Sequence, residues 1–187
     1  MKPAVSFTTA CLCELCILGL AILWAYVFRE PVLAHIRWNF RDIMAGIVAV
    51  VPLFAFLVWV AKSRSELIAE HRTLVRTLVR PLAGHWSVLQ IAAVSACAGI
   101  AEEAFFRGAI QASLDGRIGE KLALVVASIA FGAAHPITRT YAVAATLIGA
   151  YLGGLFVWTG NLLVPILCHT VYDFVALLYF RGKGTEP

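Results

Sequence analysis

Long apolar runs, separated by short polar stretches, constrain this chain more than any other feature of its sequence. A helix needs ~20 apolar residues to cross the hydrocarbon core of a bilayer. Only 14% of the 187 residues are charged, against ~25% in a typical soluble domain. We therefore expect an all-α, polytopic transmembrane helix bundle. About six spans are predicted, over Phe7–Phe28, Ile43–Ala61, Val88–Ala112, Leu122–His135, Tyr141–Trp158 and Leu162–Phe180.

The connections between the spans carry their own signals. Pro52 interrupts the second span and should kink it, because proline cannot donate a backbone hydrogen bond. Asp115–Gly119 and Thr159–Asn161 read as turns by composition. No linker or repeat divides the chain, so residues 1–187 are predicted to form a single membrane domain.

The segment Lys62–His85 has a different pattern from the spans. Its apolar residues recur at helical spacing, and arginines fall between them: Arg64, Arg72, Arg76 and Arg80. This pattern predicts one amphipathic helix that lies on the membrane surface. A substrate-binding arm is the alternative interpretation of the same segment.

The distribution of basic residues predicts the topology. With six spans both termini share a side, and most Lys and Arg residues lie on that side. Cytoplasmic loops are enriched in Lys and Arg, so both termini are expected in the cytoplasm. The net charge of +4 fits this topology, and we expect no nucleic-acid partner.

Two adjacent acids, Glu102 and Glu103, interrupt the third apolar run, and Arg107 follows four residues later. A charge near the bilayer centre costs ~2.5–3.5 kcal/mol on insertion scales, so an intramembrane ionisable residue is a functional hypothesis by default. Residues four apart share a helix face, so Glu103 and Arg107 can pair. The plainer interpretation is a purely structural ion pair.

The later spans carry two more such pairs at the same spacing: Phe131 with His135, and His169 with Asp173. The number of residues between each side chain and the nearest turn places Glu102, His135 and His169 at similar depths in the membrane. Their side chains can therefore meet in one buried cavity. The same count places that cavity nearer the turn around Gly160 than the termini. Individually, either His could be interhelical glue, and Phe131 could be simple packing.

Together, three motifs resemble those of the CAAX prenyl protease and bacteriocin-processing (CPBP/Abi) family of intramembrane glutamic endopeptidases. They are Glu102-Glu103-Ala-Phe-Phe-Arg107, Phe131-Gly-Ala-Ala-His135 and His169-Thr-Val-Tyr-Asp173. The resemblance covers residues 87–180, which would form the catalytic core, and the first two spans add nothing to it. It implies a protease in the bacterial inner (plasma) membrane that cleaves near the end of a membrane-anchored or lipidated protein or peptide.

The resemblance also implies roles for the motif residues. Glu102 and His135 would hold and deprotonate a water molecule, and His169 with Asp173 would face the developing oxyanion. Glu103, Arg107 and Phe131 would support them. The family often has Asn where this chain has Asp173, and an Asp donates a hydrogen bond only when protonated.

Three other readings stay open. The reaction is expected to need no cofactor, but a zinc-dependent variant would bind Zn²⁺ through Glu102, His135 and His169, which are plausible ligands. A non-catalytic bacteriocin-immunity or scaffold protein is the second reading. The third is a small proton-coupled carrier, because intramembrane acids and histidines also form proton relays.

Overall fold

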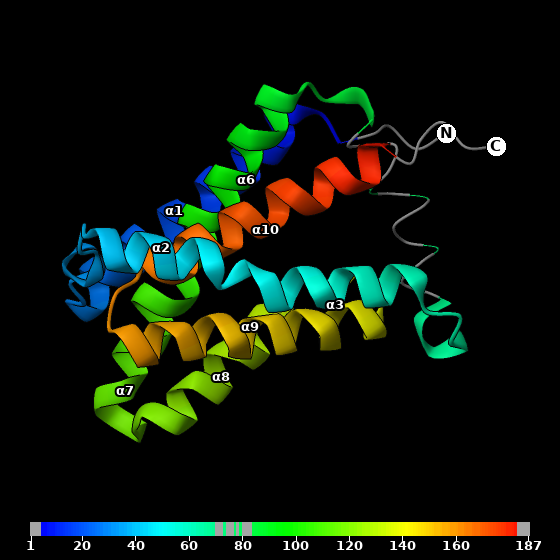
Figure 1. Cartoon of the computed structure of the whole chain (residues 1–187). Helices are drawn as coiled ribbons and strands as arrows, with labels where there is room; N and C mark the ends of the chain where they lie inside the picture. Colours follow the sequence, from blue (N-terminus) through cyan, green and yellow to red (C-terminus); the bar gives the residue numbers. More distant parts are fainter. Residues whose placement is uncertain (1–4, 70–72, 74–76, 78, 80–83, 183–187) are drawn as a thin grey trace.

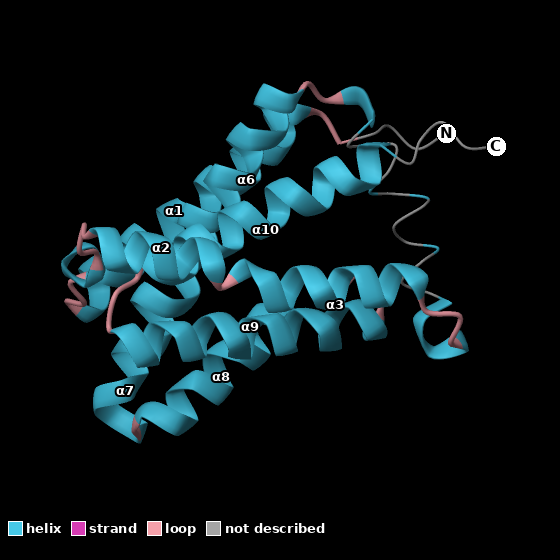
Figure 2. Ribbon diagram, viewed as in Figure 1, coloured by secondary structure: helices cyan, strands magenta, loops and turns pink. Residues whose placement is uncertain are grey.

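The computed structural model describes residues 5–69, 73, 77, 79 and 84–182, and every regular element in these residues is helical (Figure 2). Five helical runs in this part of the chain are long and apolar enough to cross a membrane. The prediction of an all-α, polytopic membrane bundle is therefore confirmed. The helices are α1 (Phe7–Phe28), α2 (Phe40–Val48), α3 (Val50–Lys62), α6 (Val88–Glu103), α7 (Ala112–Ile118), α8 (Glu120–Ala133), α9 (Arg139–Thr159) and α10 (Leu163–Gly182), with the 3₁₀ turns η1 (Val32–His35) and η2 (Glu66–Ile68) and the π-helical segment η4 (Ala104–Gln111).

The predicted fourth span, Leu122–His135, is shorter than a membrane-spanning helix. It corresponds to α8, which has 14 residues and is ~21 Å long at ~1.5 Å per residue. The hydrocarbon core is ~30 Å thick, so α8 alone does not cross it. Pro136 limits the helix, because the residue before a proline disfavours the α conformation.

The predicted third span, Val88–Ala112, is in contrast longer than expected. Helices α6, η4 and α7 form one run of 31 residues, Val88–Ile118. The predicted turn at Asp115–Gly119 is mostly helical, and the chain turns only at Gly119, whose φ is +82°. Glycine adopts this backbone conformation without steric cost.

The second span breaks where Pro52 predicts a kink. Pro52 has no N–H to donate to the carbonyl of Val48, and helix α2 ends at that residue. Ala49 separates α2 from α3, and its carbonyl accepts a hydrogen bond of 2.8 Å from the Tyr151 hydroxyl on α9. The prediction is confirmed, and α9 stabilises the break.

One end of the bundle, here called the turn end, holds the connector after α1 and the turn between α9 and α10. The Asn161 side chain donates hydrogen bonds of 2.7 Å to the Arg37 carbonyl and to the Asp42 carboxylate. Asn161 is fully buried. This contact fixes the connector against the start of α10.

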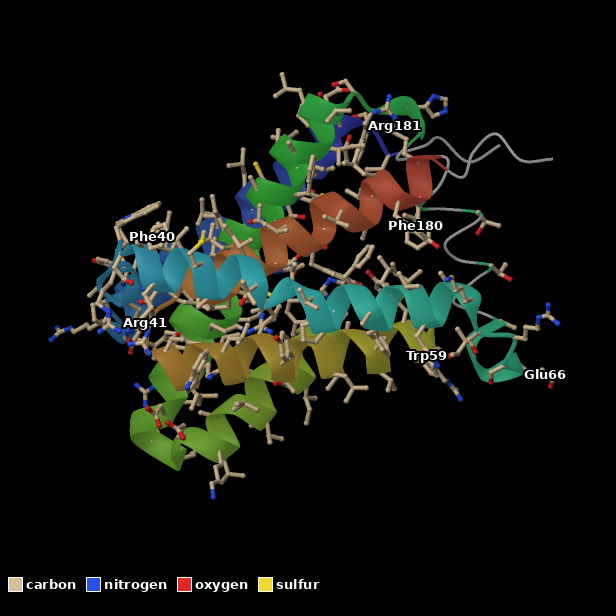
Figure 3. The ribbon with its side chains drawn as sticks, viewed as in Figure 1. Phe40, Arg41, Trp59, Glu66, Phe180 and Arg181 are labelled. Atoms are coloured by element: carbon tan, nitrogen blue, oxygen red, sulfur yellow. The ribbon has the colours of Figure 1, made fainter. Side chains whose placement is uncertain are left out.

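The opposite end, here called the terminal end, holds the start of α1 and the ends of α3 and α10 (Figure 1). The Phe7 and Trp86 rings lie 6.2 Å apart, and Phe180 packs against Leu57. In Figure 3, Arg41 lies at the turn end and Glu66 at the terminal end. Helix α1 therefore begins, and helix α10 ends, at the same end of the bundle. This is expected for a chain of six segments that alternate in direction.

The predicted amphipathic helix at Lys62–His85 falls mainly outside the described residues. Its described beginning forms η2. The prediction of an interfacial helix in this segment stays a prediction.

Candidate active site

A buried ion pair between Glu103 and Arg107 forms the base of the site. Both side chains are fully buried, and Arg107 Nη1 lies 2.8 Å from Glu103 Oε1. Arg107 Nη2 donates to the Gly149 carbonyl on α9 at 2.8 Å, and the guanidinium lies 4.5 Å from the Phe131 ring centroid. A buried pair needs such additional hydrogen bonds to offset its desolvation.

Arg107 sits in η4, an eight-residue π-helical segment directly after the two glutamates. π-Helical turns are rare and are frequent at functional sites. Here the segment lets Arg107 reach back to Glu103 and across to α9. The sequence spacing predicts the pair, but nothing in the sequence indicates the π-helical geometry.

His169 joins α10 to this ion pair. Its Nδ1 donates to Glu103 Oε1 at 2.9 Å, so Glu103 accepts from both His169 and Arg107. The other ring nitrogen, Nε2, lies 3.5 Å from Asp173 Oδ2. Asp173 therefore faces the same site as His169, as their spacing of four residues predicts.

Glu102 and His135 face each other on the other side of the site. Glu102 Oε2 lies 3.8 Å from His135 Nε2, which is too long for a direct hydrogen bond. His135 Nδ1 donates to the Phe131 carbonyl at 2.7 Å. In a neutral imidazole this bond leaves Nε2 as an acceptor directed at Glu102.

These side chains border a cavity of about 120 Å³. Polar side chains of α6, α9 and α10 line it together with His135, and apolar residues of α3, α8 and α9 form the rest of the wall. The lining residues are Phe56, Leu57, Glu102, Phe131, His135, Tyr141, Ala144, Ala145, Ile148, His169, Tyr172 and Asp173. The structure thus brings Glu102, His135, His169 and Asp173 together at one cavity.

The depth predicted for this cavity, nearer the turn around Gly160, stays a prediction, because its lining residues reach toward both ends of the bundle. Leu57 and Tyr141 line it, and they lie close to Lys62 and Arg139 at the terminal end rather than near Gly160. Helix α8 has 14 residues against 21 in α9, and both border the turn end at Glu120 and Gly160. Because α8 is short, the cavity extends toward the terminal end, while His169 lines it from the half of α10 nearer the turn end.

Sequence reasoning missed three contributors to the site. Tyr141 lies 5.9 Å from the His135 ring, measured between centroids, and Tyr172 also lines the cavity. The Gly149 carbonyl accepts from Arg107. A tyrosine next to a motif residue is a weak signal for Tyr172, whereas nothing in the sequence marks Gly149.

The zinc alternative requires Glu102, His135 and His169 to act as ligands of one ion. Within the described residues, no three His, Cys, Asp or Glu side chains are grouped so that they could hold a metal. His169 Nδ1 is engaged by Glu103, which leaves only Nε2 of this histidine for an ion. The three side chains, as placed, do not fit a zinc site.

The three motifs fall within a segment that matches a known family. Residues 84–175 match the family described as type II CAAX prenyl endopeptidase Rce1-like. The predicted resemblance is confirmed over this segment, and the match supports intramembrane protease activity in general. No curated protein and no solved structure matches the chain.

Proposed function

We propose that this protein is a glutamic-type intramembrane endopeptidase that hydrolyses a peptide bond near the end of a membrane-anchored or lipidated protein or peptide. The observation that carries the proposal is the pair of acceptors, Glu102 Oε2 and His135 Nε2, that face each other across 3.8 Å at the polar side of the cavity. Peptide hydrolysis needs an activated water at such a place. The resemblance of the motifs points to the same chemistry.

One water oxygen can lie within hydrogen-bond distance of both acceptors. In the proposed reaction, this water attacks the scissile carbonyl carbon while Glu102 takes one of its protons. The C–N bond then breaks, and Glu102 returns the proton to the leaving amine. A buried carboxylate that is poorly solvated is a better base near neutral pH than an exposed one.

Stabilisation of the oxyanion is assigned to His169 and Asp173. Two arrangements of protons fit the 3.5 Å contact between them. In one, Asp173 is a neutral acid and donates to the oxyanion. In the other, Asp173 is ionised, pairs with protonated His169, and leaves the histidine as the donor. Glu103, Arg107 and Phe131 hold the two histidines in place, through the contacts of Glu103 with His169 and of Phe131 with His135.

An apolar groove next to the cavity supports an apolar or lipidated substrate. The groove has a volume of about 420 Å³, lies between α3 and α9, and shares Phe56 and Ala144 with the cavity. Trp59 and Leu147 contribute to its almost wholly apolar wall. A substrate segment in this groove would present its peptide bond to Glu102 from the terminal end.

The test uses the purified full chain in lipid vesicles with a pair of peptides of one sequence, with and without an N-terminal lipid anchor. We expect cleavage of the anchored peptide into two products whose masses sum to that of the substrate plus one water. A chelator should leave the rate unchanged, because the proposed reaction uses no resident metal. Intact peptides at all enzyme concentrations would favour the immunity or scaffold reading, and a rate restored only by added Zn²⁺ would favour the zinc variant.

A further inference from the structure

A second polar pocket lies at the turn end of the bundle and shares no lining residue with the catalytic cavity. It has a volume of about 270 Å³ and lies between the connector after α1, the helices η4, α7 and α8, and the end of α9. Glu30 and His35 line it from the connector, and Gln111 and Asp115 line it from η4 and α7. Among the described residues that line it, none is a lysine or an arginine. The pocket therefore suits a cation.

The Gln111 side chain brings an unused hydrogen-bond acceptor to this pocket. Gln111 is only 3% exposed, and its Nε2 donates to the Gly153 carbonyl of α9 at 3.2 Å. Its Oε1 is buried and has no hydrogen-bond partner among the described residues. A Cβ atom at Gly153 would lie 2.7 Å from Oε1, so the glycine leaves room for the amide. Because a buried acceptor without a donor is costly, a ligand that donates here would be stabilised.

Glu30 and Asp115 supply carboxylates to the same pocket. His35 Nε2 lies 3.0 Å from Glu30 Oε1, and the His35 ring packs edge-on against Phe156 with 5.5 Å between centroids. This contact holds Glu30 in place and leaves its second oxygen for a ligand, while Asp115 is exposed at the mouth. With Gln111 Oε1 the pocket offers three acceptors, and a primary ammonium has three N–H donors. A metal ion fits less well, because no three His, Cys, Asp or Glu side chains in the described part of the chain are grouped to hold one.

Exposed aromatic side chains place the turn end at the level of the lipid headgroups. Tryptophan and tyrosine are enriched at the membrane–water interfaces, where their rings lie among the headgroups. Four aromatic side chains at this end are at least 72% exposed, and Phe40 is labelled in Figure 3: Tyr26, Trp38, Phe40 and Trp158. The pocket therefore opens where a lipid presents its polar group.

Arg37 lies beside the pocket and can meet a phosphate. Its Nη2 donates to the Thr159 carbonyl at 2.9 Å and would lie 3.5 Å from a Cβ atom at Gly160, which lines the pocket. The side chain is exposed, and a guanidinium has five N–H donors, so others remain for a ligand. Arginine is well suited to phosphate oxygens. An acceptor-lined pocket with an arginine at its rim matches a headgroup that joins an ammonium to a phosphate.

We propose that this turn-end pocket binds the headgroup of a phospholipid that carries a primary amine, as phosphatidylethanolamine does. The ammonium donates to Gln111 Oε1, Glu30 and Asp115, and the phosphate contacts Arg37 at the rim. Phosphatidylcholine has a quaternary ammonium without an N–H donor, and phosphatidylglycerol has no cation, so neither satisfies the three acceptors. This binding function is separate from the proposed protease activity and does not depend on it.

The experiment measures lipid retention by native mass spectrometry on the purified full chain, which is delipidated and then mixed with phospholipids of identical acyl chains. The lipids are phosphatidylethanolamine, its N-methyl and N,N-dimethyl derivatives, phosphatidylcholine and phosphatidylglycerol. We expect retention to fall with each added methyl group and to be weaker for phosphatidylcholine by on the order of tenfold or more, because each methyl removes one donor. Equal retention of phosphatidylethanolamine and either phosphatidylcholine or phosphatidylglycerol would overturn the proposal.

Variants assign the retained lipid to this pocket. Asp115→Asn changes an exposed side chain and should weaken phosphatidylethanolamine retention by on the order of tenfold, because a charge-assisted hydrogen bond becomes a neutral one. Gln111→Leu removes the buried acceptor and should weaken it as well. Glu66→Gln, an exposed acid at the terminal end, is the matched control and should retain the lipid as the parent does. Parental retention by both Asp115→Asn and Gln111→Leu would overturn the assignment.

A free headgroup distinguishes a lipid from a soluble amine as the ligand. Phosphoethanolamine has the same ammonium and phosphate but no acyl chains, so we expect it to displace phosphatidylethanolamine only in large excess. Displacement at concentrations equal to those of the lipid would assign the pocket to a soluble amine and overturn the lipid assignment. The thermal midpoint gives a second readout: phosphatidylethanolamine should raise it more for the parent than for Asp115→Asn, since a ligand stabilises the state that binds it. An equal rise in both would count against the pocket.

Discussion

Arg107 contacts three groups inside the bundle, and the Glu103 carboxylate depends on it for charge compensation. We expect Arg107→Ala to cost ~3–5 kcal/mol, the loss for a buried pair from which one partner is removed. The measurement is folded yield and thermal midpoint in detergent. Arg41→Ala is the matched control, because Arg41 is exposed at the turn end. Equal midpoints for the two variants would refute the structural role of Arg107.

Substitutions at Asp173 distinguish the two proton arrangements proposed at the oxyanion. If the neutral acid donates, Asp173→Asn should retain activity and extend it to higher pH, because an amide donates without a titrating proton. Asp173→Ala should lose ~10²–10³ in rate, the scale for removing one oxyanion donor. Cleavage rates of the two variants, measured across a range of pH, test both predictions. An inactive Asn variant favours the ion pair with His169, and a fully active Ala variant removes Asp173 from the site.

The residues of the site were predictable from the sequence, whereas their interhelical partners were not. Charged groups are rare in apolar spans, so Glu102, Glu103 and Arg107 stand out, and the four-residue spacing fixes which of them share a face. The bond from His169 to Glu103 depends on how α10 is rotated against α6. Spacing along one helix carries no information on that rotation.

Helices α6 and α10 approach closely at Gly99. A Cβ atom at this position would lie 3.0 Å from both the Ile166 carbonyl oxygen and the Thr170 nitrogen. We expect Gly99→Ala to lower the thermal midpoint by the equivalent of ~1–3 kcal/mol, because backbone must shift to admit the methyl group. Gly154→Ala on α9 is the control, since no atom lies within 4 Å of its Cβ position. If Gly99→Ala is as stable as this control, the close approach of α6 and α10 is wrong.

At the scale of elements, apolar length predicted where helices occur but not where each one ends. Gly116 in the predicted turn is tolerated inside α7, and the turn falls at Gly119 because its φ is positive. Helix α8 is short because Pro136 ends it. Both boundaries depend on local backbone conformation, to which hydropathy is insensitive.

The two ends of the whole bundle differ in the segments they hold, and this difference makes the topology testable. We expect both termini and residue 66 on the cytoplasmic side and residue 117 outside, because Lys and Arg are more frequent toward the termini. Single cysteines at these positions, in a background in which the five native cysteines are replaced, can be labelled with a membrane-impermeant reagent. Labelling of position 117 from the cytoplasmic face alone would invert the orientation and the side from which substrate enters.

The account depends most on Glu102 acting as the base. The most direct test is single-turnover cleavage of the lipid-anchored peptide by Glu102→Gln in vesicles, with Glu120→Gln as the control, because Glu120 is exposed and lines neither the cavity nor the apolar groove. Gln is nearly isosteric with Glu but is not basic, so the variant should insert, purify and melt as the parent does. The account predicts no cleavage by Glu102→Gln and parental cleavage by Glu120→Gln. Turnover by a folded Glu102→Gln variant at the parental rate would contradict it.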